Sequence, residues 1–206
     1  MDANLRAGVA IFNAGGHHAA HDAWEDHWLG LESGTDDERF LHGLIQFTAA
    51  VHHGGNGNWE GVQGLAESAG EYLDGLPSPY HGVDLEPVRS YLDELAEDPE
   101  HFERAVPPEL TVEGRALRPG DLDFEAAAVA AEVLAEAVLG YDESIVEDAI
   151  GYARGAIQAD RDGRFVALVM DFVSDAENRD VVYQRLREHV ERRRAEESDV
   201  EGLFDG

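Results

Sequence analysis

His21, Glu25 and Trp28 follow one another at spacings of four and three residues. In an α-helix these spacings place an imidazole, a carboxylate and an indole along one face. Imidazole and carboxylate together can hold a divalent metal ion or exchange protons. Seven of the ten histidines fall within residues 17–53, namely His17, His18, His21, His27, His42, His52 and His53. Chemistry is therefore expected in the first quarter of the chain.

A second polar stripe follows further along the sequence. His42, Gln46 and His53 lie at spacings of four and seven, with apolar residues between them. The pattern predicts a helix with one polar face. If the two helices pack antiparallel across a short loop, the His21 end of the first faces the His53 end of the second. Glu25 would then lie nearer Gln46.

One interpretation is a metal site. His21, Glu25 and His53 are the expected ligands, and a further group of histidines could join them: His17, His18 and His42. Such a set suits one divalent transition metal ion, namely zinc, iron, manganese or nickel. Glu25 and Gln46 are the catalytic candidates, with Gln46 orienting water or substrate. An open coordination position would permit hydrolysis. We expect no nucleotide or haem, because the sequence has no phosphate loop or dinucleotide fingerprint.

The alternative is a buried network without metal. In it Glu25 accepts a hydrogen bond from an imidazole, Gln46 bridges the helices, and Trp28 packs with its indole N–H bonded. The chain would then be a non-enzymatic binding or scaffold module, and the question of an enzyme stays open. A small-molecule pocket without metal is a third alternative. His27 and His52 lie off the stripe and are expected at the surface or rim.

The fold class follows from apolar residues that recur at helical spacing almost throughout, which predicts an all-α protein. Residues 1–97 should form an antiparallel bundle of four to five helices, followed by a proline-rich connector over 98–120. A further helical region is expected over 121–195 and a disordered tail over 196–206. The expected helices cover about residues 3–13, the stretch up to 29, 35–53, 58–76, 85–97, 124–138, 145–157, 165–173 and 181–190.

Two local patterns refine this outline. Thr35 and Glu38 have the spacing of a capping box at a helix start. The stretch from Leu110 to Leu117 alternates weakly and could form a short hairpin between the two halves of the chain. Apolar faces on both halves also make a homo-oligomer plausible.

Charge excludes several function classes. The chain has 44 acidic residues against 15 basic ones, all of them arginine, for a formal net charge of -29. A surface so acidic repels nucleic acid and favours a halophilic protein, since concentrated salt screens its self-repulsion. No apolar run approaches the roughly 18 residues of a membrane span, and no signal peptide is evident, so a cytoplasmic protein is expected. The chain has no cysteine, which excludes thiolate ligands and disulfides.

Together these residues resemble the family named domain of unknown function 309, small helical proteins with a His-x-x-x-Glu-x-x-Trp/Tyr motif. That motif is met by His21, Glu25 and Trp28 over a resemblance that covers about residues 5–76. Other positions that match the family pattern are Phe12, Asn13, Gly15, Gly43, Leu44, Ile45, Gln46, His53, Gly57 and Asn58.

This chain departs from the family pattern at two positions. Asp22 stands where the family usually has Glu, and His42 where it usually has Gln. The acidic, lysine-free composition indicates a haloarchaeal-type member. The resemblance implies no established activity; within the family, metal binding through the motif is itself a hypothesis.

Overall fold

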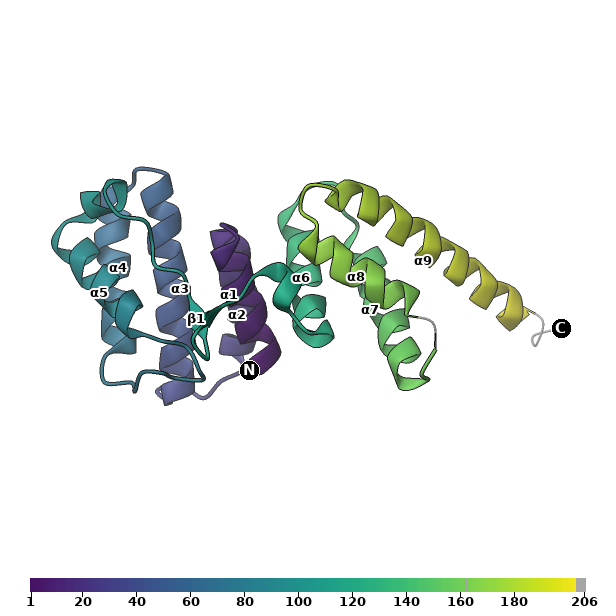
Figure 1. Ribbon diagram of the computed structural model, residues 1–206, viewed down its shortest axis with the longest axis horizontal. Coiled ribbons are helices and arrows are strands. Elements are labelled where there is room, and N and C mark those ends of the chain that lie inside the picture. Colours follow the sequence, from purple (N-terminus) through teal and green to yellow (C-terminus); the bar gives the residue numbers. More distant parts are fainter. Residues whose placement is uncertain (162, 203–206) are drawn as a thin grey trace. The chain divides into compact units, whose positions relative to one another are not determined.

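The computed structural model describes residues 1–161 and 163–202, with side chains through residue 199. It divides into two compact units, Met1–Leu122 and Asp123–Gly206. The first contains α1 (Asp2–Asn13), α2 (His17–Leu29), α3 (Asp36–Gly55), α4 (Trp59–Leu73), α5 (Glu86–Glu97), η1 (Pro99–Glu103), β1 (Thr111–Val112), β2 (Arg115–Ala116) and η2 (Pro119–Asp121) (Figure 1). The second contains α6 (Phe124–Ala137), α7 (Glu143–Gln158), α8 (Arg164–Ser174) and α9 (Arg179–Gly202). The all-α prediction is confirmed.

Helix α3 is the centre of the first unit, flanked by α2 and α4 (Figure 1). Consecutive helices pack on one another, α1 on α2, α2 on α3, α3 on α4 and α4 on α5. On α3, Phe40, Leu44, Phe47 and Val51 repeat at helical spacing and are all buried. Removal of this apolar stripe from water stabilises the bundle and fixes which face of α3 remains for polar residues.

A tight glycine turn sets the start of α2. Gly15 has φ 87°, in the left-handed region that favours glycine. Its N–H donates to the carbonyl of Phe12 at 2.8 Å, and the N–H of Gly16 donates to the carbonyl of Ile11 at 3.0 Å. These bonds satisfy the last carbonyls of α1 and reverse the chain. As a result α2 begins at His17, directly after the turn.

The start of α3 differs in one detail from a full capping box. Thr35 caps the helix, since its Oγ1 accepts from the N–H of Glu38 at 3.3 Å. In a capping box the Glu38 carboxylate would accept from the N–H of Thr35 in return. It accepts instead from the N–H of Gly34 at 3.1 Å and from the indole of Trp28 at 2.8 Å. The glutamate thus links α2 to the start of α3.

The proline-rich segment 98–120 folds into the first unit. Its β1 and β2 form the hairpin that the alternation at 110–117 suggests. Asn13 holds this segment to the end of α1, because its amide donates to the carbonyls of Leu110 and Leu117 at 2.8 and 3.0 Å. Its Oδ1 also accepts from the N–H of Leu110 at 2.9 Å. These long-range bonds, which spacing in the sequence does not reveal, make the segment part of the unit.

The second unit is a separate set of four packed helices. Within it α6 packs on α7 and α8, and α9 packs on α7 and α8. Small side chains on α6, such as those of Ala127 and Ala131, are fully buried and let neighbouring backbones approach closely. The Tyr141 ring lies 5.3 Å from the ring of Phe172 and 4.7 Å from that of Tyr183, so it packs against two residues of this core.

Helix α9 continues into the segment 196–206 that the sequence predicts as a tail. Arg193 donates to Glu197 at 2.9 Å across one turn, and Glu197 also accepts from the Tyr152 hydroxyl of α7 at 2.8 Å. Polar pairs of this kind support a helix where apolar periodicity has ended. The helix therefore runs to Gly202, and the last four residues lie outside the described part of the chain.

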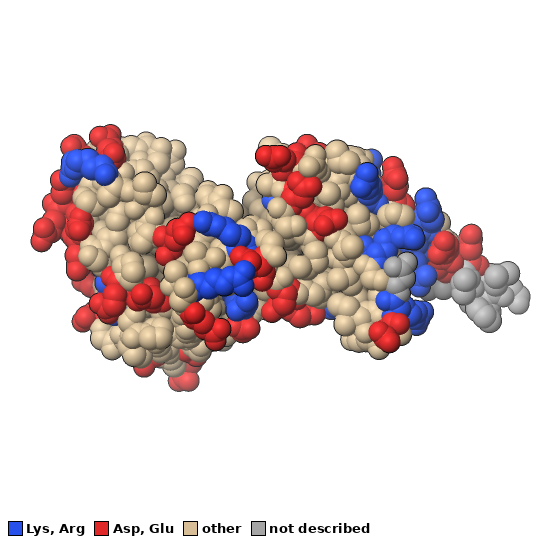
Figure 2. Space-filling view, viewed as in Figure 1, with Lys and Arg blue, Asp and Glu red and all other residues tan. Residues whose placement is uncertain are grey.

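Acidic side chains appear on both units in the face that Figure 2 shows, and six of the 15 arginines lie in α9. Nine of the 15 arginines lie in Asp123–Gly206. Most of the arginines therefore belong to the second unit. None of the described helices is long and apolar enough to cross a membrane.

Candidate metal centre

Five imidazoles line one cavity of the first unit, where the first turns of α2 meet the last turns of α3. The cavity has a volume of about 310 Å³. Its lining residues are His17, His18, His21, Thr48, Ala49, His52 and His53. We call it the histidine cavity. Antiparallel packing of α2 and α3 brings the His21 end of one helix to the His53 end of the other, as the sequence predicts.

Asp22 connects two of these histidines. Its Oδ2 lies 2.9 Å from Nδ1 of His18, and its Oδ1 lies 3.1 Å from Nδ1 of His21. Because a carboxylate only accepts, both bonds place a proton on Nδ1 of the imidazole. In the neutral form of such an imidazole Nε2 keeps its lone pair, and that is the form that binds a metal. The sequence marks Asp22 only as a departure from the family pattern, although its four-residue spacing from His18 signals this contact.

Glu25 lies on the same side of α2. Its Oε2 is 3.9 Å from Nδ1 of His21. One possible ligand atom from each of His21, Asp22 and Glu25 lies within 4.8 Å of the others. Their side chains are 30%, 25% and 44% exposed, so water reaches the group. A metal ion held here would keep open coordination positions.

His53 borders the histidine cavity from α3 and is held by Asn58. The Nδ2 of Asn58 lies 2.7 Å from Nδ1 of His53, while its Oδ1 accepts from the N–H of Gly61 at 3.2 Å. Asn58 therefore caps α4, as expected for this position, and donates its amide to the imidazole. In this arrangement Nδ1 of His53 is an acceptor and its Nε2 carries the proton. His53 would have to change tautomer to bind a metal through Nε2.

The remaining histidines differ in burial. The exposed His52 ring lies 6.1 Å from that of His18, at the rim of the cavity as expected. The His17 ring is partly buried, 5.1 Å from that of Phe12. Burial, together with the charge of His52, holds the pKa of His17 below its ordinary value. His17 is therefore neutral at neutral pH and available as a ligand.

Trp28 and His42, from the two polar stripes, line a different cavity of about 620 Å³. Glu38 and Tyr72 also line this cavity. His42 stacks on Tyr72 with ring centroids 3.8 Å apart, and its Nδ1 lies 3.4 Å from the Glu38 carboxylate. Gln46 contacts His42, with 3.4 Å between its Nε2 and the Nε2 of the ring. The structure thus divides the polar residues of α2 and α3 into two groups. His42 and Gln46 lie with Trp28, whereas His21 lies with Glu25.

The charge of Glu38 in this second group is stabilised by hydrogen bonds. Burial raises the pKa of its carboxyl, but hydrogen bonds from Trp28 and Gly34 and the nearby His42 outweigh burial and leave that pKa lowered. The buried carboxylate is therefore ionised at neutral pH and already has its donors.

Comparison with known proteins gives a match to one family model over part of the chain. The model of the family described as Domain of unknown function (DUF309) matches residues 5–65. No curated protein matches the chain. The matched segment contains most of α1, all of α2 and α3, and the start of α4. It therefore includes the lining of the histidine cavity. It also includes Trp28, Glu38, His42 and Gln46, which we call the Trp28 group. The first unit accordingly resembles this family over residues 5–65, a family whose description assigns no activity.

Proposed function

We propose that the first unit binds one divalent transition metal ion beside His21, a residue that lines the histidine cavity. The observation that carries the proposal is the group formed by His21, Asp22 and Glu25, whose possible ligand atoms lie within 4.8 Å of one another. His21 and Glu25 are the ligands, and Asp22 either completes the set or orients the imidazoles of His18 and His21. A further imidazole close to this group is that of His18, whose ring lies 6.2 Å from that of His21.

The donors decide the class of metal. A mixture of imidazole nitrogen and carboxylate oxygen suits zinc, iron, manganese or nickel, whereas calcium and magnesium prefer oxygen ligands alone. Two to three protein ligands leave positions for water. Metal-bound water ionises near neutral pH and becomes a nucleophile. Hydrolysis of a small molecule is therefore the reaction that we assign to the site. The acidic composition supports a halophilic protein, and we propose that it is cytoplasmic.

Cobalt titration of the untagged full chain tests the proposal, because Co²⁺ ligated by imidazole absorbs visible light. We expect saturation at about one equivalent in molar KCl. His21→Ala should lose at least about tenfold in affinity, and Asp22→Asn should lose affinity by about tenfold through its effect on imidazole orientation. His27→Ala is the matched control, because it removes an imidazole from the same helix outside the cavity. Identical titrations in all four proteins would overturn the proposal.

A non-enzymatic binding or scaffold role has its own support in the Trp28 group. Glu38 accepts from Trp28 at 2.8 Å and from Gly34 at 3.1 Å, and it lies 3.4 Å from His42. Such a network fixes the register of α2 against α3 whether or not a metal binds. His42→Gln, which introduces the usual residue of the family, should change stability and leave the cobalt titration unchanged. A lost titration would place His42 among the ligands instead.

A further inference from the structure

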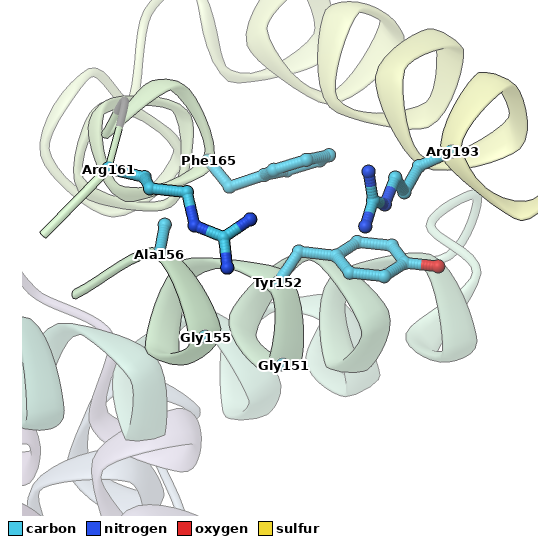
Figure 3. Close-up of a pocket in the computed structure, with 7 residues that line it drawn as sticks. All are labelled: Gly151, Tyr152, Gly155, Ala156, Arg161, Phe165 and Arg193. Carbon is cyan, nitrogen blue, oxygen red and sulfur yellow. The ribbon is translucent and has the colours of Figure 1, made fainter. Parts of the chain in front are cut away.

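The second unit holds a cavity of about 350 Å³, the size of a pocket for a small molecule. It lies among α7, the loop after α7, α8 and α9 (Figure 3). Its lining residues are Gly151, Tyr152, Gly155, Ala156, Arg161, Phe165 and Arg193. We call it the arginine cavity. It combines bare helix backbone, two aromatic rings and two guanidinium groups.

Two glycines keep the cavity open. Gly151 and Gly155 are one helical turn apart on α7, and a methyl group added at either would meet nothing within 4 Å. A glycine in a helix interior costs about 0.5–1 kcal/mol relative to alanine. The space above these residues is thus left unfilled although larger side chains would fit and would favour the helix.

The aromatic wall is held in place by bonds around it. The Tyr152 and Phe165 rings lie 5.2 Å apart at an interplanar angle of 40°. The Tyr152 hydroxyl donates to Glu197 at 2.8 Å, and the guanidinium of Arg193 lies 5.8 Å from the centre of the Tyr152 ring. Since Arg193 also donates to Glu197 at 2.9 Å, its charge is largely neutralised within the protein.

Among the described residues that line the cavity, Arg161 is the cation that remains for a ligand. Its guanidinium lies beside the cavity in Figure 3, above the end of α7 and on the same side as the two rings. Within the described part of the chain, no side chain forms an ion pair with it. The available positive charge of this cavity is therefore that of one guanidinium.

The backbone around Arg161 is arranged to place it there. Asp160 has φ 48°, the left-handed conformation that usually belongs to glycine at the end of a helix. Its N–H donates to the carbonyl of Ile157 at 3.2 Å, and the N–H of Arg161 donates to the carbonyl of Ala156 at 3.0 Å. This pair of bonds folds the chain back over the last turn of α7 and brings Arg161 to the cavity.

We propose that the arginine cavity binds a small organic carboxylate with a flat apolar body, such as an aromatic acid. The carboxylate would pair with Arg161, and the apolar body would lie over the Gly151–Gly155 backbone against Phe165. Guanidinium binds a carboxylate through two parallel hydrogen bonds. One available cation matches one negative charge, and the acidic surface disfavours larger polyanions. Apolar walls favour a ring over a bare inorganic anion.

The test uses benzoate as the probe, with benzamide as its uncharged analogue and inorganic phosphate as an anion without a ring. Binding to the full chain in molar KCl is followed by saturation-transfer NMR and by titration calorimetry. The variants are Arg161→Gln, which removes the cation, and Gly155→Leu, which fills the cavity with a residue that suits a helix. Arg192→Gln is the matched control, since it removes the same charge from α9 outside the lining. Circular dichroism establishes that each variant is folded.

We expect saturable benzoate binding that Arg161→Gln weakens by about tenfold or more. Gly155→Leu should abolish binding, and Arg192→Gln should leave it unchanged. Benzamide and phosphate should both bind more weakly than benzoate. Failure of benzoate to saturate the parent protein would overturn the proposal. Equal binding by the parent and the two cavity variants, or binding of phosphate as strong as that of benzoate, would also overturn it.

Discussion

Trp28 of α2 donates its indole N–H to the carboxylate of Glu38 of α3 at 2.8 Å. Glu38 is only 8% exposed and takes a second bond from the N–H of Gly34. The tryptophan of the His-x-x-x-Glu-x-x-Trp motif is therefore bonded to the next helix and not to Glu25 of its own stripe. Since the histidine cavity is built from α2 and α3 together, this bond helps to align its two walls.

Removal of the indole N–H should destabilise the first unit most at neutral pH. Trp28→Phe is expected to lower the free energy of unfolding by about 2 kcal/mol at pH 7, the usual cost of a lost hydrogen bond to a charged group. The lowered pKa of Glu38 contributes stability above the ordinary carboxyl pKa and loses it as pH falls through the folded value. The deficit of Trp28→Phe should therefore shrink toward pH 4.

Urea unfolding in molar KCl at pH 7 and pH 4 measures this difference. Trp59→Phe at the start of α4 is the control, because it makes the same exchange of ring outside the Trp28 group. An equal deficit for Trp28→Phe at both pH values would show that Glu38 is not the partner that matters.

The histidine cavity should contain an imidazole that resists protonation. Burial is the larger cause of the lowered pKa of His17, and His52 is the second. His52→Ala should therefore raise the pKa of His17 only part of the way to its ordinary value. His189→Ala in the second unit is the control. NMR titration of the imidazole protons gives the pKa of His17 in the parent protein and in each variant.

The sign of this shift also predicts a pH dependence of stability. Because the folded pKa of His17 lies below its unfolded value, protonation favours unfolding as pH falls below about 6.5. Stability from this residue is fully present at higher pH and is lost as pH falls toward the folded pKa. An unchanged or lower pKa of His17 in His52→Ala would contradict the proximity of the two rings.

The contact between α1 and α2 should tolerate no side chain at Gly8. A Cβ there would lie 2.1 Å from Nε1 of the fully buried Trp24. Gly8→Ala should cost about 3 kcal/mol or more, because the ring has nowhere to move in a packed core. Gly64→Ala on α4 is the matched control. Its Cβ would meet nothing within 4 Å, so it should gain about 0.5–1 kcal/mol. Chemical denaturation measures the free energy of unfolding of both variants. Equal changes in the two variants would contradict the close packing of Gly8 on Trp24.

Salt should stabilise the whole chain. With a net charge of -29, the folded protein repels itself, and the screening distance falls from roughly 10 Å at 0.1 M salt to roughly 3 Å at 1 M. The midpoint of thermal unfolding should rise by several degrees between these concentrations of KCl, most steeply at the low end. Sucrose at equal osmolality is the control for solvent exclusion. A midpoint that is flat or falls with KCl would contradict the halophilic interpretation.

Much of the fold was predictable from the sequence, because the spacing of apolar residues indicates helices and glycines indicate where helices end. Phe40, Leu44 and Phe47 mark the buried face of α3, and Gly15 marks the turn before α2. Two features could not be predicted. Asn13 holds the proline-rich segment through bonds to residues almost a hundred positions away. Likewise α9 extends past its apolar repeat because of polar pairs such as Arg193 with Glu197.

The location of the candidate site was predictable from the sequence. Its division into one group around His21 and another around Trp28 was not. Spacing places His21 and Glu25 on one face and brings His53 to the same end of the helix pair. It does not show that Glu38 takes the indole of Trp28, because that bond joins two helices. Nor does it show that Asn58 holds His53, since the pairing depends on the turn between α3 and α4. The ligands of the metal site remain a prediction.

Elemental analysis tests the central claim most directly. Untagged protein purified in molar KCl without chelator is compared with His21→Ala and with the control His189→Ala. The account predicts about one transition metal ion per chain in the parent and the control, and almost none in His21→Ala. Folded parent protein that holds no metal, even after incubation with zinc, iron, manganese and nickel and then desalting, would contradict the metal site. It would favour the structural role of the polar stripe instead.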